Sequence, residues 1–322
     1  MSLGKTIKLS NGKTIPQIGL GTWLSQPHEV EQAVEWAVEA GYRHIDCAKC
    51  YENQDEVGAA LKKVIPKLVK RDELFITSKL WNNSHRPELV EPALDQTLAE
   101  LGLDYLDLYL VHWPVAFQPG GKLTPEGENG HPILDLEPSL VSTWRAMIKL
   151  LDTGKVKTIG VSNFNIARLK ALIRETGVVP VVNQIEAHPL LPQDELVAYC
   201  AEKNIHLTAY SPLGNNLAGE KKLVDYPEVT EVADELGATT AQVLVAWGAH
   251  RGYSVIPKSV NKDRIYSNFK QIELAPAAYE KVSKIGVGRT RRFNKPALYK
   301  PSWRINVFDE EGETTYPALP VV

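Results

Sequence analysis

Short apolar runs alternate with longer amphipathic stretches along most of the chain. In the stretch 29–39, apolar residues stand at positions 30, 33, 34, 37 and 38, which is the spacing of an amphipathic helix. The runs Thr158–Val161 and Val179–Val182 are instead largely apolar and β-branched, as strands buried on both faces of a parallel sheet are. The pattern predicts eight strands, at Gln17–Gly21, His44–Asp46, Leu74–Lys79, Leu106–His112, Val156–Ser162, Val181–Ala187, His206–Ser211 and Ser254–Lys258.

Strand and helix alternate about eight times, which is typical of a (β/α)8 TIM barrel. A doubly wound open sheet with a second domain is the rival architecture, but no proline-rich or polar linker divides the middle of the chain. At ~150 residues per domain the length of 322 suggests two domains, yet barrels often form one domain of ~200–250 residues. We expect one α/β barrel domain over residues 1–322. Its predicted helices are Glu29–Glu39, Glu88–Leu101, Ser142–Leu151, Glu195–Glu202, Ala241–His250 and Ile265–Phe269.

Three segments are predicted to decorate this barrel. Residues 5–16 form a hairpin, because Asn11-Gly12 separates two short alternating runs. The segment Gln118–Leu136 is rich in glycine and proline and follows the fourth strand, where an insert reaches the carboxyl-terminal face on which barrels bind ligands. The tail 289–322 lacks regular patterning and is expected to lie as a loop over the mouth of the barrel.

Composition and charge narrow the functional classes. Hydrophobic residues make up 43% and charged residues 23% of the chain, as in ordinary globular proteins, and this argues against disorder. The net charge of −3 gives no field that would attract nucleic acid. No apolar run of ~18 residues exists, and the first residues lack the apolar core of a signal peptide. With three cysteines, we expect a cytoplasmic protein that acts on a small molecule, without a nucleic-acid or membrane partner.

Four residues that could act together follow successive predicted strands. Asp46, Lys79 and His112 end the second, third and fourth strands, and Tyr51 stands just beyond the second. Each alone is more often structural; a strand-end carboxylate, for example, can simply cap a helix. In a closed barrel, however, all four would surround one opening.

Their chemistry suits the protonation of a carbonyl oxygen. A free phenol has a pKa of ~10, and a nearby ammonium lowers it. The carboxylate of Asp46 would hold Lys79 charged and oriented, and Lys79 would lower the pKa of Tyr51. A neutral His112 could position the substrate oxygen. The four side chains could therefore protonate a carbonyl oxygen while a hydride adds to its carbon.

Other motifs are weaker. Gly19–Gly21 begins like a dinucleotide fingerprint, but Leu24 stands where the third glycine belongs. Cys47 and Cys50 have Cys-x-x-Cys spacing, yet only Cys200 remains as a further cysteine ligand for zinc. No His-x-His, His-Glu-x-x-His or Gly-x-Ser-x-Gly motif occurs, so we expect no metal and no serine hydrolase. Oxidation of the Cys47–Cys50 pair to a disulfide, with displacement of the tyrosine beside it, remains a hypothesis.

Several segments together resemble the signatures of the aldo-keto reductase family. They run in order along nearly the whole chain, from about residue 6 to residue 294. Further matches, at Trp81–Pro87 and Ile305–Phe308, are most similar to fungal NADPH-dependent aldehyde reductases, which are related to xylose reductase, aldose reductase and glycerol dehydrogenase. The family segments are Gly19–Trp23, Asp46–Gly58, Ile76–Trp81, Leu108–Pro114, Gly160–Phe164 and Ile256–Val260.

The resemblance implies a catalytic tetrad and a cofactor. Tyr51 would be the general acid in reduction and the base in oxidation, assisted by Lys79, Asp46 and His112. NADPH would lie extended on the barrel mouth, with Lys258, Ser259 and Arg264 at its 2′-phosphate. Asp263 stands nearby, so use of NADH is left open. The full set of cofactor positions is Thr22, Trp23, Ser162, Asn163, Gln184, Tyr210, Ser211, Leu213, Asn215, Lys258, Ser259, Val260, Arg264 and Asn268.

An aromatic pocket would receive the substrate. Aromatic walls favour aldehydes with an apolar body, whereas Asn294 matches a motif of fungal sugar reductases. The expected function is NADPH-dependent reduction of aldehydes and some ketones. A polyol or sugar reductase, a glycerol dehydrogenase and a cofactor-sensing binding subunit are the alternatives, and a monomer is favoured over a dimer. The expected pocket residues are Trp23, Trp81, Trp113, Phe293 and Asn294, with Tyr299 and Trp303 also contributed by the tail.

Overall fold

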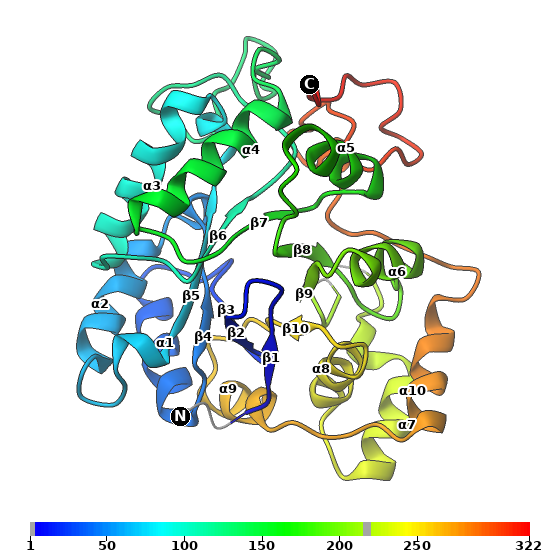
Figure 1. Cartoon of the computed structure of the whole chain (residues 1–322). Coiled ribbons are helices and arrows are strands. Elements are labelled where there is room, and N and C mark those ends of the chain that lie inside the picture. The colour runs from blue at the N-terminus through cyan, green and yellow to red at the C-terminus, as the bar shows by residue number, and fades with distance from the viewer. Residues whose placement is uncertain (1–3, 215–219) are drawn as a thin grey trace.

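Parallel strands form a closed barrel at the centre of the molecule (Figure 1). In the computed structural model, which describes residues 4–214 and 220–322, eight strands pair in chain order. The first and last strands also meet, because Gly19 N donates to Val255 O at 2.9 Å and Val255 N donates to Gln17 O at 2.7 Å. The closed (β/α)8 barrel is therefore confirmed over the open sheet. Its strands are β3 (Leu20–Gly21), β4 (His44–Asp46), β5 (Phe75–Leu80), β6 (Leu108–Val111), β7 (Ile159–Ser162), β8 (Val182–Glu186), β9 (His206–Tyr210) and β10 (Ser254–Val255).

Helices surround the barrel (Figure 1). The six predicted helices are present as α1 (Glu29–Ala40), α3 (Pro87–Leu101), α4 (Leu140–Lys149), α6 (Asp194–Glu202), α8 (Thr240–His250) and α9 (Lys262–Phe269). Four more were not predicted: α2 (Gln54–Val64), α5 (Ile166–Thr176), α7 (Pro227–Leu236) and α10 (Pro276–Ser283). In the sequence, Gly58 interrupts the helical pattern of α2. A Cβ at this position would lie 2.5 Å from Glu100 O of α3. The glycine thus permits the close approach of α2 to α3.

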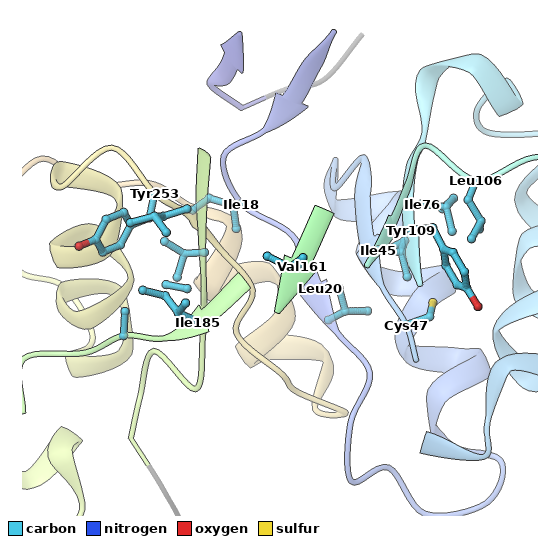
Figure 2. Close-up of a cluster of buried hydrophobic side chains, with 14 of the residues drawn as sticks. Ile18, Leu20, Ile45, Cys47, Ile76, Leu106, Tyr109, Val161, Ile185 and Tyr253 are labelled. Atoms are coloured by element: carbon cyan, nitrogen blue, oxygen red, sulfur yellow. The ribbon is translucent and has the colours of Figure 1, made fainter. Parts of the chain in front are cut away.

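Side chains alternate between the two faces of each strand, as the period of two requires. Ile45, Ile76, Val161 and Ile185 point outward into the main hydrophobic cluster between barrel and helices, part of which Figure 2 shows. Inward residues near the amino-terminal end of the barrel instead form a separate apolar cluster. Inward residues at the carboxyl-terminal end are polar and form the site described below. The apolar cluster at the amino-terminal end consists of Leu9, Ile15, Phe75, Leu108, Leu110 and Val182.

The predicted hairpin closes the amino-terminal end of the barrel. β1 (Thr6–Lys8) and β2 (Thr14–Pro16) pair antiparallel, and Gly12 takes a positive φ of 82° in the turn between them. Leu9 and Ile15 from this hairpin join the apolar cluster inside the barrel. Water is thereby excluded from that end, so the opposite end provides the opening.

The long insert and the tail are irregular, as predicted. His131 Nδ1 of the insert lies 2.9 Å from Ser302 O of the tail, so the two segments meet. The tail is anchored to the barrel's outer helices, because Arg168 of α5 donates to Asn306 O at 3.1 Å and Leu140 N of α4 donates to Pro320 O at 2.8 Å. Within the described residues, no helix has both the length and the apolar character that crossing a membrane requires.

Close packing inside the barrel can be tested at Gly160. A Cβ at this position would lie 2.4 Å from Val182 O and 2.9 Å from Leu110 Cδ2. We expect Gly160→Ala to lower the free energy of unfolding by about 1–3 kcal/mol, measured by urea denaturation. Gly121→Ala is the matched control, because a Cβ there meets no atom within 4 Å. Equal stability of the two variants would contradict this account of the barrel interior.

Candidate active site

The four predicted residues meet at the carboxyl-terminal end of the barrel. Asp46 and Lys79 occupy inward positions near the ends of β4 and β5, and His112 directly follows β6. Tyr51 ends a short 3-10 helix, Lys49–Tyr51, that turns back over the opening after β4. The ring of His112 lies 5.9 Å from that of Tyr51, edge to face. The alternation of side chains along the strands therefore brings these residues together.

A buried ion pair forms the floor of this group. Lys79 Nζ lies 2.7 Å from Asp46 Oδ2, and both side chains are almost fully buried, at 0% and 2% exposure. Lys79 also donates to Cys47 O at 2.8 Å and to Tyr51 OH at 3.3 Å. Gln184 Nε2 donates to the other oxygen of Asp46 at 2.7 Å. The ammonium is thus fixed with one N–H directed at the phenol oxygen.

The pKa of Tyr51 differs from the sequence-based expectation. Burial raises the pKa of the phenol well above its usual value of 10, and the Asp46 carboxylate acts in the same direction. Burial is the largest cause, so the net pKa is raised; that the ammonium of Lys79 acts in the opposite direction stays a prediction. Tyr51 therefore holds its proton at neutral pH, as an acid must before it can donate.

His112 is neutral, as predicted. Burial lowers the pKa of its imidazole well below 6.5, and the nearby Lys79 charge adds to the shift. Its backbone carbonyl accepts a hydrogen bond from Asn163 Nδ2 at 3.0 Å. One ring nitrogen, Nδ1, lies 3.6 Å from Cys50 Sγ. A neutral imidazole can donate from one nitrogen and accept at the other.

Several predicted cofactor positions form a hydrogen-bonded group beside the tetrad. Ser162 Oγ donates to Gln184 O at 2.8 Å, and Tyr210 OH donates to Asn163 Oδ1 at 2.7 Å. Asn163 has a positive φ of 65°, which turns its side chain toward His112 and Tyr210. Thr22 Oγ1 donates to Asp46 O at 2.8 Å on the other side of the ion pair. These amide and hydroxyl groups offer the donors and acceptors that a carboxamide requires.

The predicted phosphate-binding residues lie together at the start of α9. Ser259 Oγ accepts from Asn261 N at 3.1 Å, and Asn261 caps the helix by accepting from Arg264 N at 3.0 Å. Lys258 is half-buried, donates to Leu24 O at 2.8 Å, and has a pKa lowered by burial. An ammonium, a hydroxyl and an exposed guanidinium at a helix amino terminus suit a phosphate. The donor set therefore fits the 2′-phosphate of NADPH.

The remaining predicted cofactor positions follow β9 or lie on and just before α9. Ser211 follows β9 with a positive φ of 48°, and Leu213 packs against the main hydrophobic cluster. Val260 also packs against that cluster, and Asn268 is buried on α9. Asn215 lies outside the described residues.

Aromatic side chains form one wall of the opening. Trp81 and Trp113 are nearly buried, and Trp303 of the tail packs edge to face against both, at 5.8 and 5.6 Å between ring centroids. Trp81 also lies 5.2 Å from the ring of His112. Trp23 stands apart from this cluster with 46% exposure, 6.5 Å from the ring of Tyr51. Tyr299 packs in this cluster, as expected. Phe117, Phe308 and Cys50 also pack here, and the sequence analysis did not assign them to the pocket.

Phe293 and Asn294 lie outside the Trp81–Trp113–Trp303 cluster, against a buried carboxylate at the barrel mouth, and their role in the substrate pocket stays a prediction. Glu186, at the end of β8, accepts from Phe293 N at 2.8 Å and from Asn294 N and Nδ2 at 2.8 and 3.0 Å. His188 Nε2 lies 2.9 Å from the same carboxylate. Sequence reasoning missed Glu186, although it stands two residues after Gln184 and so shares its inward face. This carboxylate fixes the start of the tail to the barrel mouth.

The cysteine pair carries free thiols. Burial raises the pKa of Cys47 to about 12 and that of Cys50 above its usual value. Both thiols are therefore protonated at neutral pH, and the disulfide hypothesis stays untested. Among the described residues, no group of three or more His, Cys, Asp or Glu side chains could hold a metal ion.

Comparisons with known proteins identify the relatives of this chain. The sequence profile of the aldo/keto reductase family matches residues 17–286. The D/L-glyceraldehyde reductase of Hypocrea jecorina is 53% identical over 97% of both chains. The human aldo-keto reductase family 1 member A1 is 40% identical, again over 97% of both. Among solved structures, an aldose reductase from Schistosoma japonicum superposes with a TM-score of 0.84 at 39% identity, covering 98% of both chains.

Proposed function

Because the chain belongs to the aldo/keto reductase family, we propose that it uses NADPH to reduce aldehydes and some ketones to alcohols, with Tyr51 as the proton donor. The observation that carries this proposal is the contact of Lys79 Nζ with both Asp46 and Tyr51 inside the barrel mouth. The protonated phenol of Tyr51, the fixed ammonium of Lys79 and the neutral imidazole of His112 therefore lie together in the barrel mouth.

Each of the four residues has a separate role in the proposed reduction. Bound NADPH supplies the hydride that adds to the carbonyl carbon. His112 donates a hydrogen bond to the carbonyl oxygen and orients it. Tyr51 gives its proton to that oxygen, so an alcohol forms and the phenolate remains on the protein. Lys79 stabilises the phenolate, and Asp46 keeps the ammonium charged and directed at it.

The cofactor would be held by the groups already described. Ser162, Asn163 and Gln184 present donors and acceptors for the carboxamide, and Tyr210 supplies an aromatic face. Lys258, Ser259 and Arg264 at the start of α9 would bind the 2′-phosphate.

Removing a cation of the phosphate site gives a direct test. We expect Arg264→Ala to raise the KM for NADPH by about 10- to 100-fold, because a charge-assisted hydrogen bond to phosphate is lost. The KM for NADH, which lacks that phosphate, should stay unchanged. Arg174→Ala, an exposed cation on α5, is the matched control. An equal loss with both cofactors would contradict the assignment.

The aromatic wall favours aldehydes with an apolar body. Trp81, Trp113 and Trp303 form it, and Trp303 contacts the other two edge to face. A second class, small hydroxyaldehydes, is supported by the 53% identical D/L-glyceraldehyde reductase. Initial rates of NADPH oxidation with an aromatic aldehyde, glyceraldehyde, D-glucuronate and D-xylose would separate the two classes. Saturable NADPH binding without turnover of any carbonyl would overturn the reductase proposal in favour of a cofactor-sensing subunit.

We also propose that the enzyme is a cytoplasmic monomer with one barrel domain. Three free thiols, two of them with pKa values raised by burial in the site, suit a reducing compartment. The eight-stranded barrel brings all the catalytic side chains from one chain, so no second copy is needed to complete the site. Light scattering with size-exclusion chromatography would measure the mass, and a dimer would overturn this point.

A further inference from the structure

Cys50 is a residue of the site that the proposed mechanism does not use. It stands directly before Tyr51 in the 3-10 helix and packs against the aromatic wall. Its sulfur lies 3.6 Å from Nδ1 of His112, within the range of a hydrogen bond to sulfur. Among the described residues, the Cys50 thiol provides the hydrogen-bond contact of the His112 imidazole ring. The thiol therefore touches the group that orients the substrate.

We propose that Cys50 is a positioning residue whose thiol donates to Nδ1 of His112 and so keeps the ring proton on Nε2, where it can donate to the substrate carbonyl. The inference rests on the proposed function, because it assigns His112 a donor role toward a carbonyl oxygen.

The direction of this hydrogen bond follows from the chemistry of the two partners. A carbonyl oxygen only accepts, so the ring nitrogen that meets it must carry the proton. A neutral imidazole has one ring proton, which leaves the other nitrogen as an acceptor. Burial raises the pKa of the Cys50 thiol, so the sulfur retains a hydrogen to donate. If Nδ1 carried the proton instead, sulfur would have to act as a weak acceptor and Nε2 could not donate.

No other described group performs this task. Asn163 bonds the backbone carbonyl of His112 rather than its ring. Trp81 and Trp113 contact the ring through their aromatic faces and edges, at 5.2 and 6.3 Å between centroids. These contacts fix the plane of the imidazole but leave its proton free to occupy either nitrogen. The thiol is the contact that distinguishes the two nitrogens.

Two variants separate loss of the hydrogen-bond donor from loss of the cysteine itself. Cys50→Ser keeps a donor, whereas Cys50→Val fills the position with an apolar side chain that has none. With NADP+ bound and histidine labelled with 15N, the His112 signals report the tautomer directly; they are assigned by their loss in His112→Gln. We expect one tautomer, protonated on Nε2, in the parent protein and in Cys50→Ser, and a mixture in Cys50→Val.

Turnover provides the second measurement. Cys50→Val is expected to lower kcat for aldehyde reduction by about two- to fivefold, because a weak hydrogen bond is lost, with the KM for NADPH unchanged. Cys50→Ser should keep most of kcat. An unchanged tautomer in Cys50→Val, or equal slowing by serine and valine, would overturn the inference. Because the tautomer is read without turnover, failure of the reductase proposal would show separately, as an absence of carbonyl reduction by the parent protein.

Discussion

Replacing Tyr51 with phenylalanine is expected to lower kcat for aldehyde reduction by about 10²- to 10⁴-fold, the usual contribution of a positioned general acid. The ring keeps its place, because its edge-to-face contact with His112 at 5.9 Å does not involve the hydroxyl. The variant loses the proton that completes the alcohol. Steady-state oxidation of NADPH with an aromatic aldehyde measures the effect.

Cofactor binding separates this loss from misfolding. NADPH affinity, measured by quenching of tryptophan fluorescence, should stay near that of the parent protein, because the proposed phosphate-binding residues lie around the start of α9. Tyr105→Phe is the matched control: this tyrosine packs its ring under Arg71, 4.0 Å from the guanidinium carbon, outside the barrel mouth. If Tyr51→Phe retained most of its turnover, another group would have to supply the proton.

The raised pKa of Tyr51 gives this prediction a pH dependence. Burial and the Asp46 carboxylate place the pKa well above 10, so the acid form persists through neutral pH. Reduction needs the protonated phenol, and its rate should therefore not fall through loss of this proton below pH 10. Oxidation of an alcohol needs the phenolate, so its rate should rise with pH over the same range. Rates in both directions, measured from pH 6 to 10, test the sign.

The tetrad could be predicted because strand geometry is local. Asp46 and Lys79 end apolar runs whose alternation decides which face each side chain occupies. A parallel barrel then brings all strand ends to one opening, whatever the connecting helices are. The same rule places Gln184 and Glu186 on the inner face of β8. Applied to every strand, it would have found Glu186 as well.

The tail could not be placed by such rules. The backbone N–H groups of Phe293 and Asn294 bond Glu186, more than 100 residues earlier in the chain, and this contact could not be predicted. No periodicity connects an irregular segment with a distant carboxylate. The raised pKa of Tyr51 could not be predicted for a related reason: burial depends on everything packed around the ring, whereas the sequence displays only the charged neighbours.

Removing the ammonium of Lys79 is expected to have the largest combined effect on stability and activity. Lys79→Met keeps an unbranched apolar chain but leaves the carboxylate of Asp46 buried without its cation. Breaking a buried ion pair on one side costs about 3–5 kcal/mol, so the free energy of unfolding should fall by that amount. Reduction should also slow by about 10²-fold or more, because the phenolate left on Tyr51 loses its stabilising charge. Urea denaturation and NADPH oxidation measure the two effects.

A double variant separates the structural role of the pair from its chemical role. Asp46→Asn with Lys79→Met removes both charges, and the new amide oxygen can still accept from Gln184 Nε2, which bonds Asp46 at 2.7 Å. Neutralising both partners of a buried pair is often nearly neutral for stability. The double variant should therefore regain most of the lost unfolding free energy and remain inactive. Recovery of activity together with stability would show that Lys79 only fills space, and its assigned role beside Tyr51 would be wrong.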